Sequence, residues 1–157
     1  AIVMGACKEG LRLSQVPLSE TSTVLRLSSS SMKVISTQGL SRITCNLVLP
    51  IAAQAGKRIV IEQSRIKVRS RISENSSALV HQEVFLAGTS ARAIDLRLNQ
   101  PNAIVNALSR ERIAGECGGA VNLRMNQSIA LSSASEAVSS AQVINSRIIV
   151  SVEDCIQ

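Results

Sequence analysis

Apolar and polar residues alternate along most of the chain, which is the period of a β-strand rather than of a helix. The clearest run is segment 65–72, in which four cations alternate with apolar residues. Similar patterns predict strands near residues 11–13, 24–27, 43–49, 59–61, 79–86, 94–98, 121–131 and 148–152. Many short strands spaced about ten residues apart are typical of an antiparallel sandwich or barrel. We therefore expect an all-β fold, specifically an antiparallel β-sandwich of jelly-roll-like form.

A few segments depart from this alternation. Pro50 predicts a break after the strand at 43–49. Three apolar residues in segment 102–112 have helical spacing, so this is the one segment that fits a helix, with an irregular loop as the alternative. The serine-rich segment 132–140 is expected to be a hairpin loop because a strand and a cysteine follow it.

The chain contains four cysteines, Cys7, Cys45, Cys117 and Cys155. An even number of cysteines favours pairing in an oxidising compartment, and four buried free thiols are the alternative. No Cys-x-x-Cys pair occurs and His81 is the only histidine, so no metal site is expected. Four cysteines allow three connectivities, of which the equal sequence intervals favour Cys7 with Cys45 and Cys117 with Cys155. We therefore expect two disulfides that staple the sandwich.

Composition bears on the core and on the location. Among 157 residues the chain has one Phe, Phe85, and no Trp or Tyr, so aliphatic side chains must fill the core. No run of about 18 apolar residues occurs, which argues against a transmembrane helix. A start at Ala1 is expected of a mature protein after signal removal, although a cleaved tag would leave the same end. Together with the cysteines, this predicts a single secreted domain spanning 1–157, outside the cell or at its surface.

The formal net charge is +6, which favours acidic partners or simply keeps the protein soluble. The sharpest basic feature is the strand at 65–72, in which Arg65, Lys67, Arg69 and Arg71 share one face. Cations about 7 Å apart along a strand match a repeating polyanion. The alternative is the solvated side of a half-buried strand, whose charges block edge-to-edge aggregation. No aromatic residue stands near these cations to stack bases, which argues against nucleic acid.

No motif in the chain names a reaction. Catalysis by histidine needs a nucleophile and an orienting acid, and His81 lies in a predicted strand, where a structural role is favoured. The carboxylates are scattered, and neither a phosphate loop nor a dinucleotide fingerprint occurs. We predict a protein that is not an enzyme, with no catalytic residues and no cofactor.

The N-terminal segment is apolar and precedes a glycine. It consists of Ala1, Ile2, Val3 and Met4. Such a segment could be donated as a strand to a second copy of the protein, which would build a head-to-tail polymer. The alternative is a first strand that pairs within its own sheet.

Short motifs around the cysteines resemble a known family. They are Gly5-Ala6-Cys7-Lys8-Glu9-Gly10, an Arg-x-x-Cys-x-Leu strand at 42–47, Cys117-Gly118-Gly119 followed by a Leu-x-x-Asn strand from Leu123, and the closing Cys155. Their order resembles that of the secreted proteins of fungi and bacteria grouped as domain of unknown function 4360. That family tends to have Pro at the place of Lys8 and aromatic residues at the places of Arg69, Ser70 and Glu116. It has no established activity, so the resemblance implies a secreted β-protein and leaves the ligand open.

Two functions follow from these observations. The first is a non-enzymatic exported structural or surface-interaction protein that assembles into extracellular polymers by strand donation or sheet-edge contacts. The second is a binding module that holds an anionic polysaccharide or cell-wall polymer on the basic strand at 65–71.

Overall fold

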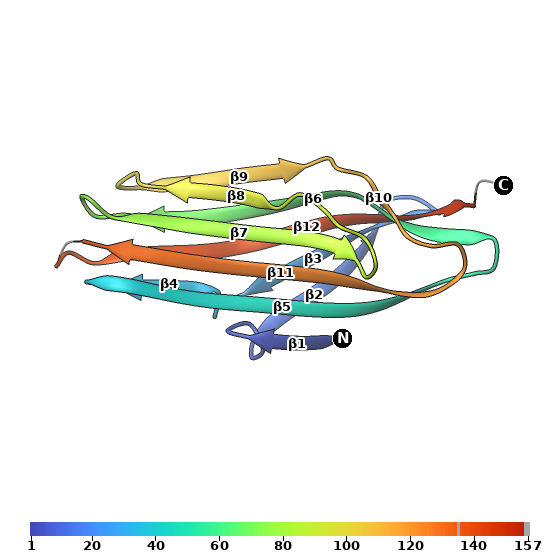
Figure 1. The fold of residues 1–157 in the computed structure, drawn as a ribbon, viewed down its shortest axis with the longest axis horizontal. Coiled ribbons are helices and arrows are strands. Elements are labelled where there is room, and N and C mark those ends of the chain that lie inside the picture. Colours follow the sequence, from blue (N-terminus) through green and yellow to red (C-terminus); the bar gives the residue numbers. More distant parts are fainter. Residues whose placement is uncertain (135, 156–157) are drawn as a thin grey trace.

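The structure, a computed structural model, describes residues 1–134 and 136–155. Over these residues the chain forms twelve β-strands and no helix (Figure 1). The strands are β1 (Ile2–Gly5), β2 (Leu11–Pro17), β3 (Ser22–Ser29), β4 (Lys33–Ser36), β5 (Gly39–Ala53), β6 (Lys57–Arg71), β7 (Ser77–Leu86), β8 (Ile94–Leu98), β9 (Ala103–Ser109), β10 (Ile113–Ala114), β11 (Gly119–Ser133) and β12 (Ser139–Asp154). The predicted hairpin loop at 132–140 includes Ser135, which lies outside the described residues.

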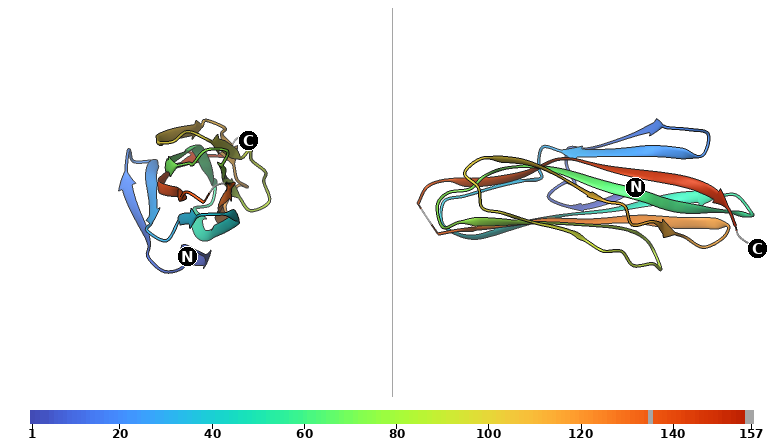
Figure 2. Two further views of the ribbon diagram at one scale, coloured as in Figure 1. Left: turned by 90° about the vertical axis from the view of Figure 1, so that its left-hand side faces the viewer. Right: turned by 90° about the horizontal axis from the view of Figure 1, so that it is seen from above.

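The strands form two antiparallel sheets packed face to face, which gives an elongated sandwich (Figures 1 and 2). The five-stranded sheet has the order β1-β5-β11-β7-β8. The seven-stranded sheet has the order β10-β6-β12-β3-β2, with β9 also beside β6 and β4 also beside β12. Four neighbouring strands of the seven-stranded sheet (β3, β12, β6 and β9) and four of the five-stranded sheet (β5, β11, β7 and β8) follow the order of a jelly roll. The predicted all-β, jelly-roll-like sandwich is confirmed.

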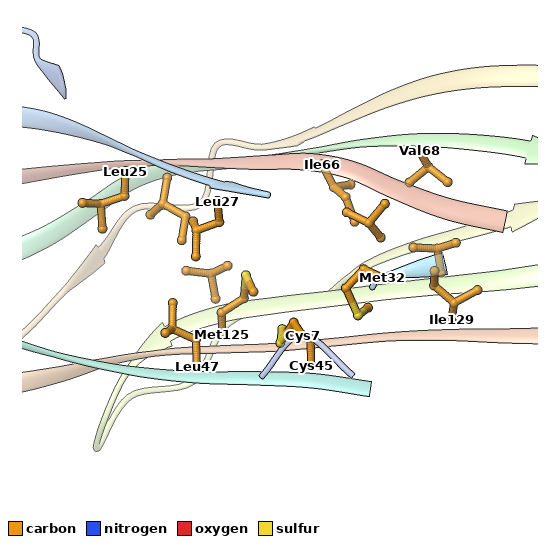
Figure 3. Close-up of a cluster of buried hydrophobic side chains, with 14 of the residues drawn as sticks. Cys7, Leu25, Leu27, Met32, Cys45, Leu47, Ile66, Val68, Met125 and Ile129 are labelled. Carbon is orange, nitrogen blue, oxygen red and sulfur yellow. A yellow bond between two sulfur atoms is a disulfide. The ribbon is translucent and has the colours of Figure 1, made fainter. Parts of the chain in front are cut away.

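Aliphatic side chains from both sheets fill the space between them, as the lack of aromatic residues required (Figure 3). Leu25, Leu27 and Ile66 of one sheet face Leu47 and Met125 of the other. Each of these residues belongs to a strand in which the neighbouring residues along the chain point outward. The period-two pattern of the sequence therefore separates core from surface.

A buried polar network crosses this apolar core. The side chain of Gln127 donates to the carbonyl oxygen of the Gln82 side chain at 2.8 Å and to the Ser146 hydroxyl at 2.9 Å. Ser146 donates to the same Gln82 oxygen at 2.6 Å. Gln82 in turn donates to the backbone carbonyl of Arg65 at 3.4 Å, so the network fastens β6 to the opposite sheet. Buried polar groups that are paired in this way specify one relative position of the two sheets.

Two predictions about local structure were wrong. Segment 102–112 holds strand β9 instead of a helix, because Ile104 and Leu108 point outward while Val105 packs against the core. The same spacing of three apolar residues fits a helix and a half-buried strand, and pairing with β6 decides between them. Pro50 does not break its strand, since β5 continues to Ala53. β1 reaches only to Val48, so Pro50 lies where β5 has no neighbour on that side, and its missing N–H costs no ladder hydrogen bond.

Both disulfides form as the equal intervals favoured. Cys7 pairs with Cys45 and Cys117 with Cys155, with Cα–Cα distances of 5.3 and 5.8 Å. The first bridge is buried under β1 and β5, whereas the second lies at the surface and joins the segment before β11 to the end of β12. The first bridge therefore ties the segment after β1 to the middle of β5, and the second ties the start of β11 to the end of β12.

The N-terminal segment forms an edge strand of its own molecule. Residues Ile2–Gly5 make up β1 and pair antiparallel with Cys45–Val48 of β5. Gly5 has a φ of 91° and packs so closely on the Thr44 carbonyl that a Cβ would collide with it. The first strand therefore pairs within its own sheet, which was the alternative to strand donation. Donation of Ala1–Met4 to another copy stays a prediction.

Candidate polyanion-binding face

The outer face of the seven-stranded sheet collects cations from five strands, and we call it the basic face. It carries Arg12 of β2, Arg26 of β3, Lys33 of β4, Arg65, Lys67, Arg69 and Arg71 of β6, and Arg147 of β12. The β6 residues between these cations, such as Ile66 and Val68, are fully buried. Strand β6 therefore cannot turn its cations away without exposing part of the core, and the four side chains predicted for anion binding do share one outer face.

Strand register brings further cations beside the predicted ones. Arg147 lies directly opposite Arg65 on one side and Arg26 on the other. Directly opposed residues of an antiparallel pair have Cβ atoms about 5 Å apart, and like charges at that distance destabilise the sheet. The row Arg65–Arg147–Arg26 therefore places three positive charges side by side, an arrangement whose repulsion a bound anion would remove.

Acidic residues are missing from the part of these strands that carries the cations. β2, β3, β4 and β9 contain none, and those of β6 and β12 lie at the other end of these strands. Within the described part of the chain, none of the eight cations makes an ion pair or a side-chain hydrogen bond. The face thus presents free guanidinium and ammonium groups to the solvent.

The opposite end of the same sheet shows the contrasting arrangement. Arg58 donates to Glu153 at 2.6 Å, and Arg112 contacts both Glu153 and Glu62. The hydrogen bond from Arg58 is the main cause that lowers the pKa of the Glu153 carboxyl. Partial desolvation opposes it, and Arg112 lowers the pKa further. Lys57 and Asp154 form another pair there. The cations at this end are neutralised, so in the described strands of this sheet the cations without an acidic partner are those of the basic face.

Sequence reasoning identified the four cations of β6 and missed Arg12, Arg26, Lys33 and Arg147. Each of the missed residues is the only cation in its stretch of strand, so none forms a run. A signal was present, because Leu-Arg-Leu at 11–13 and at 25–27 places each arginine on the polar side of its strand. What the sequence alone did not contain was the order of the strands, which brings these separate arginines together.

His81 lies on the outer face of the other sheet. Its Nδ1 is 2.7 Å from Asp95, its Nε2 is 4.0 Å from Glu83, and Ser128 lies across from it in register. These residue types occur in hydrolytic triads, but over the described residues no hydrogen bond joins Ser128 to His81. The row therefore lacks the link between nucleophile and base that such chemistry requires.

Two further features bear on ligands. Within residues 1–134 and 136–155, no group of three or more histidine, cysteine or acidic side chains is arranged to hold a metal ion. No helix in that part of the chain is long and apolar enough to cross a membrane.

Fold and surface together define an antiparallel β-sandwich with one cationic sheet face. No family model and no curated protein matches the chain, so the resemblance to the secreted family stays a prediction. Among solved structures, similarity extends to a carbohydrate-binding module, TmCBM61 in complex with β-1,4-galactotriose, with 10% identity, a TM-score of 0.34 and coverage of 94% of this chain and 90% of that one. The carbohydrate-binding module BiXyn10A CBM1 in its apo form matches at 16% identity and a TM-score of 0.32, with 96% of both chains covered.

A third similar structure is that of the infectious bursal disease virus Gx strain, at 12% identity and a TM-score of 0.40, covering 90% of this chain and 32% of that one. At these identities and TM-scores the similarities carry no argument about a ligand or an activity. The function has to be argued from the surface of this chain.

Proposed function

We propose that this protein is a non-enzymatic binding module that holds an anionic polymer, an acidic polysaccharide, on its basic face. The observation that supports this proposal most directly is the row Arg65–Arg147–Arg26, in which three unpaired arginines lie opposite one another. Arginine binds carboxylate, phosphate and sulfate groups through a fork of parallel hydrogen bonds. A polymer with regularly spaced acidic groups would neutralise this row and the cations along β6 together.

The chemistry of the face favours an acidic polysaccharide over nucleic acid. Binding of single-stranded nucleic acid relies on aromatic side chains on which the bases stack. The only aromatic residue, Phe85, belongs to β7 of the other sheet. The basic face offers charge and hydrogen-bond donors without a stacking platform.

We place this activity in an extracellular setting. All four cysteines are paired, and disulfides persist in oxidising compartments. The alternative of a self-assembling structural protein has less support, because β1 pairs with its own sheet and the neighbouring Cys7 is bonded to Cys45 of the same chain.

Reversing two charges of the basic face tests the proposal. Arg69 and Arg71 are exposed, so Arg69→Glu with Arg71→Glu should leave the fold intact and lower the salt concentration that elutes the protein from a heparin column. The matched control is Arg97→Glu with Arg124→Glu, which makes the same change in net charge with exposed arginines of the other sheet. If retention falls equally in both variants, net charge alone explains the effect and the basic face has no special role. If retention is unchanged in the Arg69/Arg71 variant, the proposal is contradicted.

A further inference from the structure

The basic face contains a hollow where β12 loses its neighbour. β3 pairs with β12 at Ser146 to Ser151, and β4 pairs with it at Ser139 to Gln142. Between these two stretches the register of β12 against β6 shifts from Val143 to Asn145, so Ile144 is the extra residue of a β-bulge. The bulge and the missing neighbour leave an open depression of about 510 Å³ between β12 and the β2–β3 hairpin.

The residues that line this hollow are suited to one chemical group. Arg12, Arg26 and Arg147 contribute three guanidinium groups, and none of them has an acidic partner in the described part of the chain. Ser14 and Ser28 add hydroxyl groups, and Asn145 adds an amide. Leu27, whose side chain belongs to the core, and Ile144 complete the lining.

Register explains why these donors converge. Arg26 of β3 lies between Ser14 of β2 and Arg147 of β12. Two residues further along these strands, Arg12 of β2 lies opposite Ser28 of β3. Opposed residues are about 5 Å apart and alternate residues of one strand about 7 Å apart. The guanidinium and hydroxyl donors therefore come from neighbouring positions on three strands, close enough for several of them to reach one oxyanion in the hollow.

We propose that this hollow is a subsite for a tetrahedral oxyanion, a sulfate or phosphate ester carried by the polymer. This inference rests on the proposed function and names the acidic group that it recognises. A carboxylate offers two oxygens, fewer than three guanidinium groups and two hydroxyls can engage. A sulfate or phosphate monoester offers three terminal oxygens, which accept hydrogen bonds from several arginines at once.

Titration with small anions tests the subsite without a polymer. Inorganic sulfate and inorganic phosphate, each added at constant ionic strength and followed by amide NMR shifts, should saturate a site that includes Arg26, Asn145 and Arg147. Acetate under the same conditions should not. The tighter of the two tetrahedral anions identifies the ester. Equal saturation by acetate, or shifts spread evenly over all cations, would overturn the inference.

Variants assign the binding to the hollow. Arg26→Gln with Arg147→Gln should weaken binding of the preferred anion at least about tenfold, since each lost charged hydrogen bond is a substantial part of the affinity. The matched control, Arg97→Gln with Arg124→Gln, removes the same charge on the other sheet and should stay within about twofold. Ser28→Val keeps every charge and fills the hollow, so it should also weaken binding. Variants of the hollow that bind as well as the control pair would overturn the inference.

Polymers separate this inference from the proposed function. Dextran sulfate should bind more tightly than polygalacturonate, and Arg26→Gln with Arg147→Gln should remove most of that difference. If both polymers bind equally and every variant weakens them alike, the subsite is wrong and the module remains. If sulfate saturates the hollow but no polymer is retained, the module is wrong and the subsite remains.

Discussion

At the scale of single residues, the molecule treats its charges in two ways. Glu153 accepts from Arg58 and contacts Arg112, whereas Arg26 and Arg147 face each other without an acid between them. Charge pairs of the first kind stabilise a folded chain modestly, and unpaired like charges of the second kind weaken it. The two ends of the same sheet therefore differ in how their charges affect the stability of the fold.

The Glu153 pair makes stability depend on pH. Because its pKa is lowered in the folded protein, the ionised carboxylate stabilises the fold above the pKa of an unfolded glutamate. This contribution shrinks as the pH falls through the unfolded value and is lost below the lowered folded value. Glu153→Gln should therefore lower the free energy of unfolding at pH 7 and make no difference at a pH below both values, as measured by urea unfolding. Glu20→Gln is the control, because within the described residues this exposed carboxylate makes no ion pair. An equal effect of Glu153→Gln at both pH values would contradict the expected dependence on pH.

The residue scale is also where sequence reasoning reached its limit at the candidate site. Alternation predicts that Arg26 and Arg147 point outward, because the pattern of each strand assigns its faces. It does not predict that they are neighbours, since 121 positions of chain (147 minus 26) separate them and only the sheet order joins them. The buried Gln82, Gln127 and Ser146 were not predicted for the same reason.

At the scale of strands, predictions succeeded where the pattern was long and failed where a bulge interrupts it. The two strands predicted near 59–61 and 65–72 are one strand, β6, because the extra residue Glu62 shifts the alternation by one position. A one-residue shift turns the apolar set to the other face, so a continuous strand looks like two. The prediction for segment 102–112 was wrong for a different reason. The apolar pattern of this segment is too short for its spacing to distinguish a strand from a helix.

The disulfides allow the effect of burial to be measured separately from that of chain closure. Both bridges close intervals of 38 residues, so each reduces the entropy that the chain gains on unfolding by the same amount, about 4 kcal/mol in the loop-closure model. Cys7 and Cys45 are 0% and 1% exposed, whereas Cys117 is exposed. Cys7→Ala with Cys45→Ala should therefore lower the free energy of unfolding by about 1–2 kcal/mol more than Cys117→Ala with Cys155→Ala, because it also leaves a cavity.

Urea unfolding of the two double variants and of the native protein gives the comparison. Equal losses would show that the buried sulfurs contribute no packing energy. A larger loss in the surface pair would mean that the C-terminal end of β12 contributes more to stability than the core contacts of the first bridge.

At the scale of the whole molecule, the edges of the sheets decide whether copies associate. Strand β1 covers the Cys45–Val48 part of one edge of the five-stranded sheet and is held by the bridge at the adjacent Cys7. Strands β8 and β9 run alongside each other and close another side of the sandwich (Figure 1). At the remaining edge β2 ends in Pro17, and proline discourages the addition of a further strand. An isolated copy therefore has few open edges, while its basic face stays free.

We expect the isolated protein to be a monomer of 16.7 kDa by size exclusion with light scattering, because its open edges are short and its positive faces repel one another. Addition of dextran sulfate should gather several copies on each polymer chain, and salt should release them as it screens the contacts with the basic face.

Cys7→Ala with Cys45→Ala frees the N-terminal segment and tests strand donation directly. If the native protein forms filaments without any polyanion, and Gly5→Ala reduces them, assembly through β1 would be favoured instead. The Gly5→Ala substitution weakens the packing of β1 on β5.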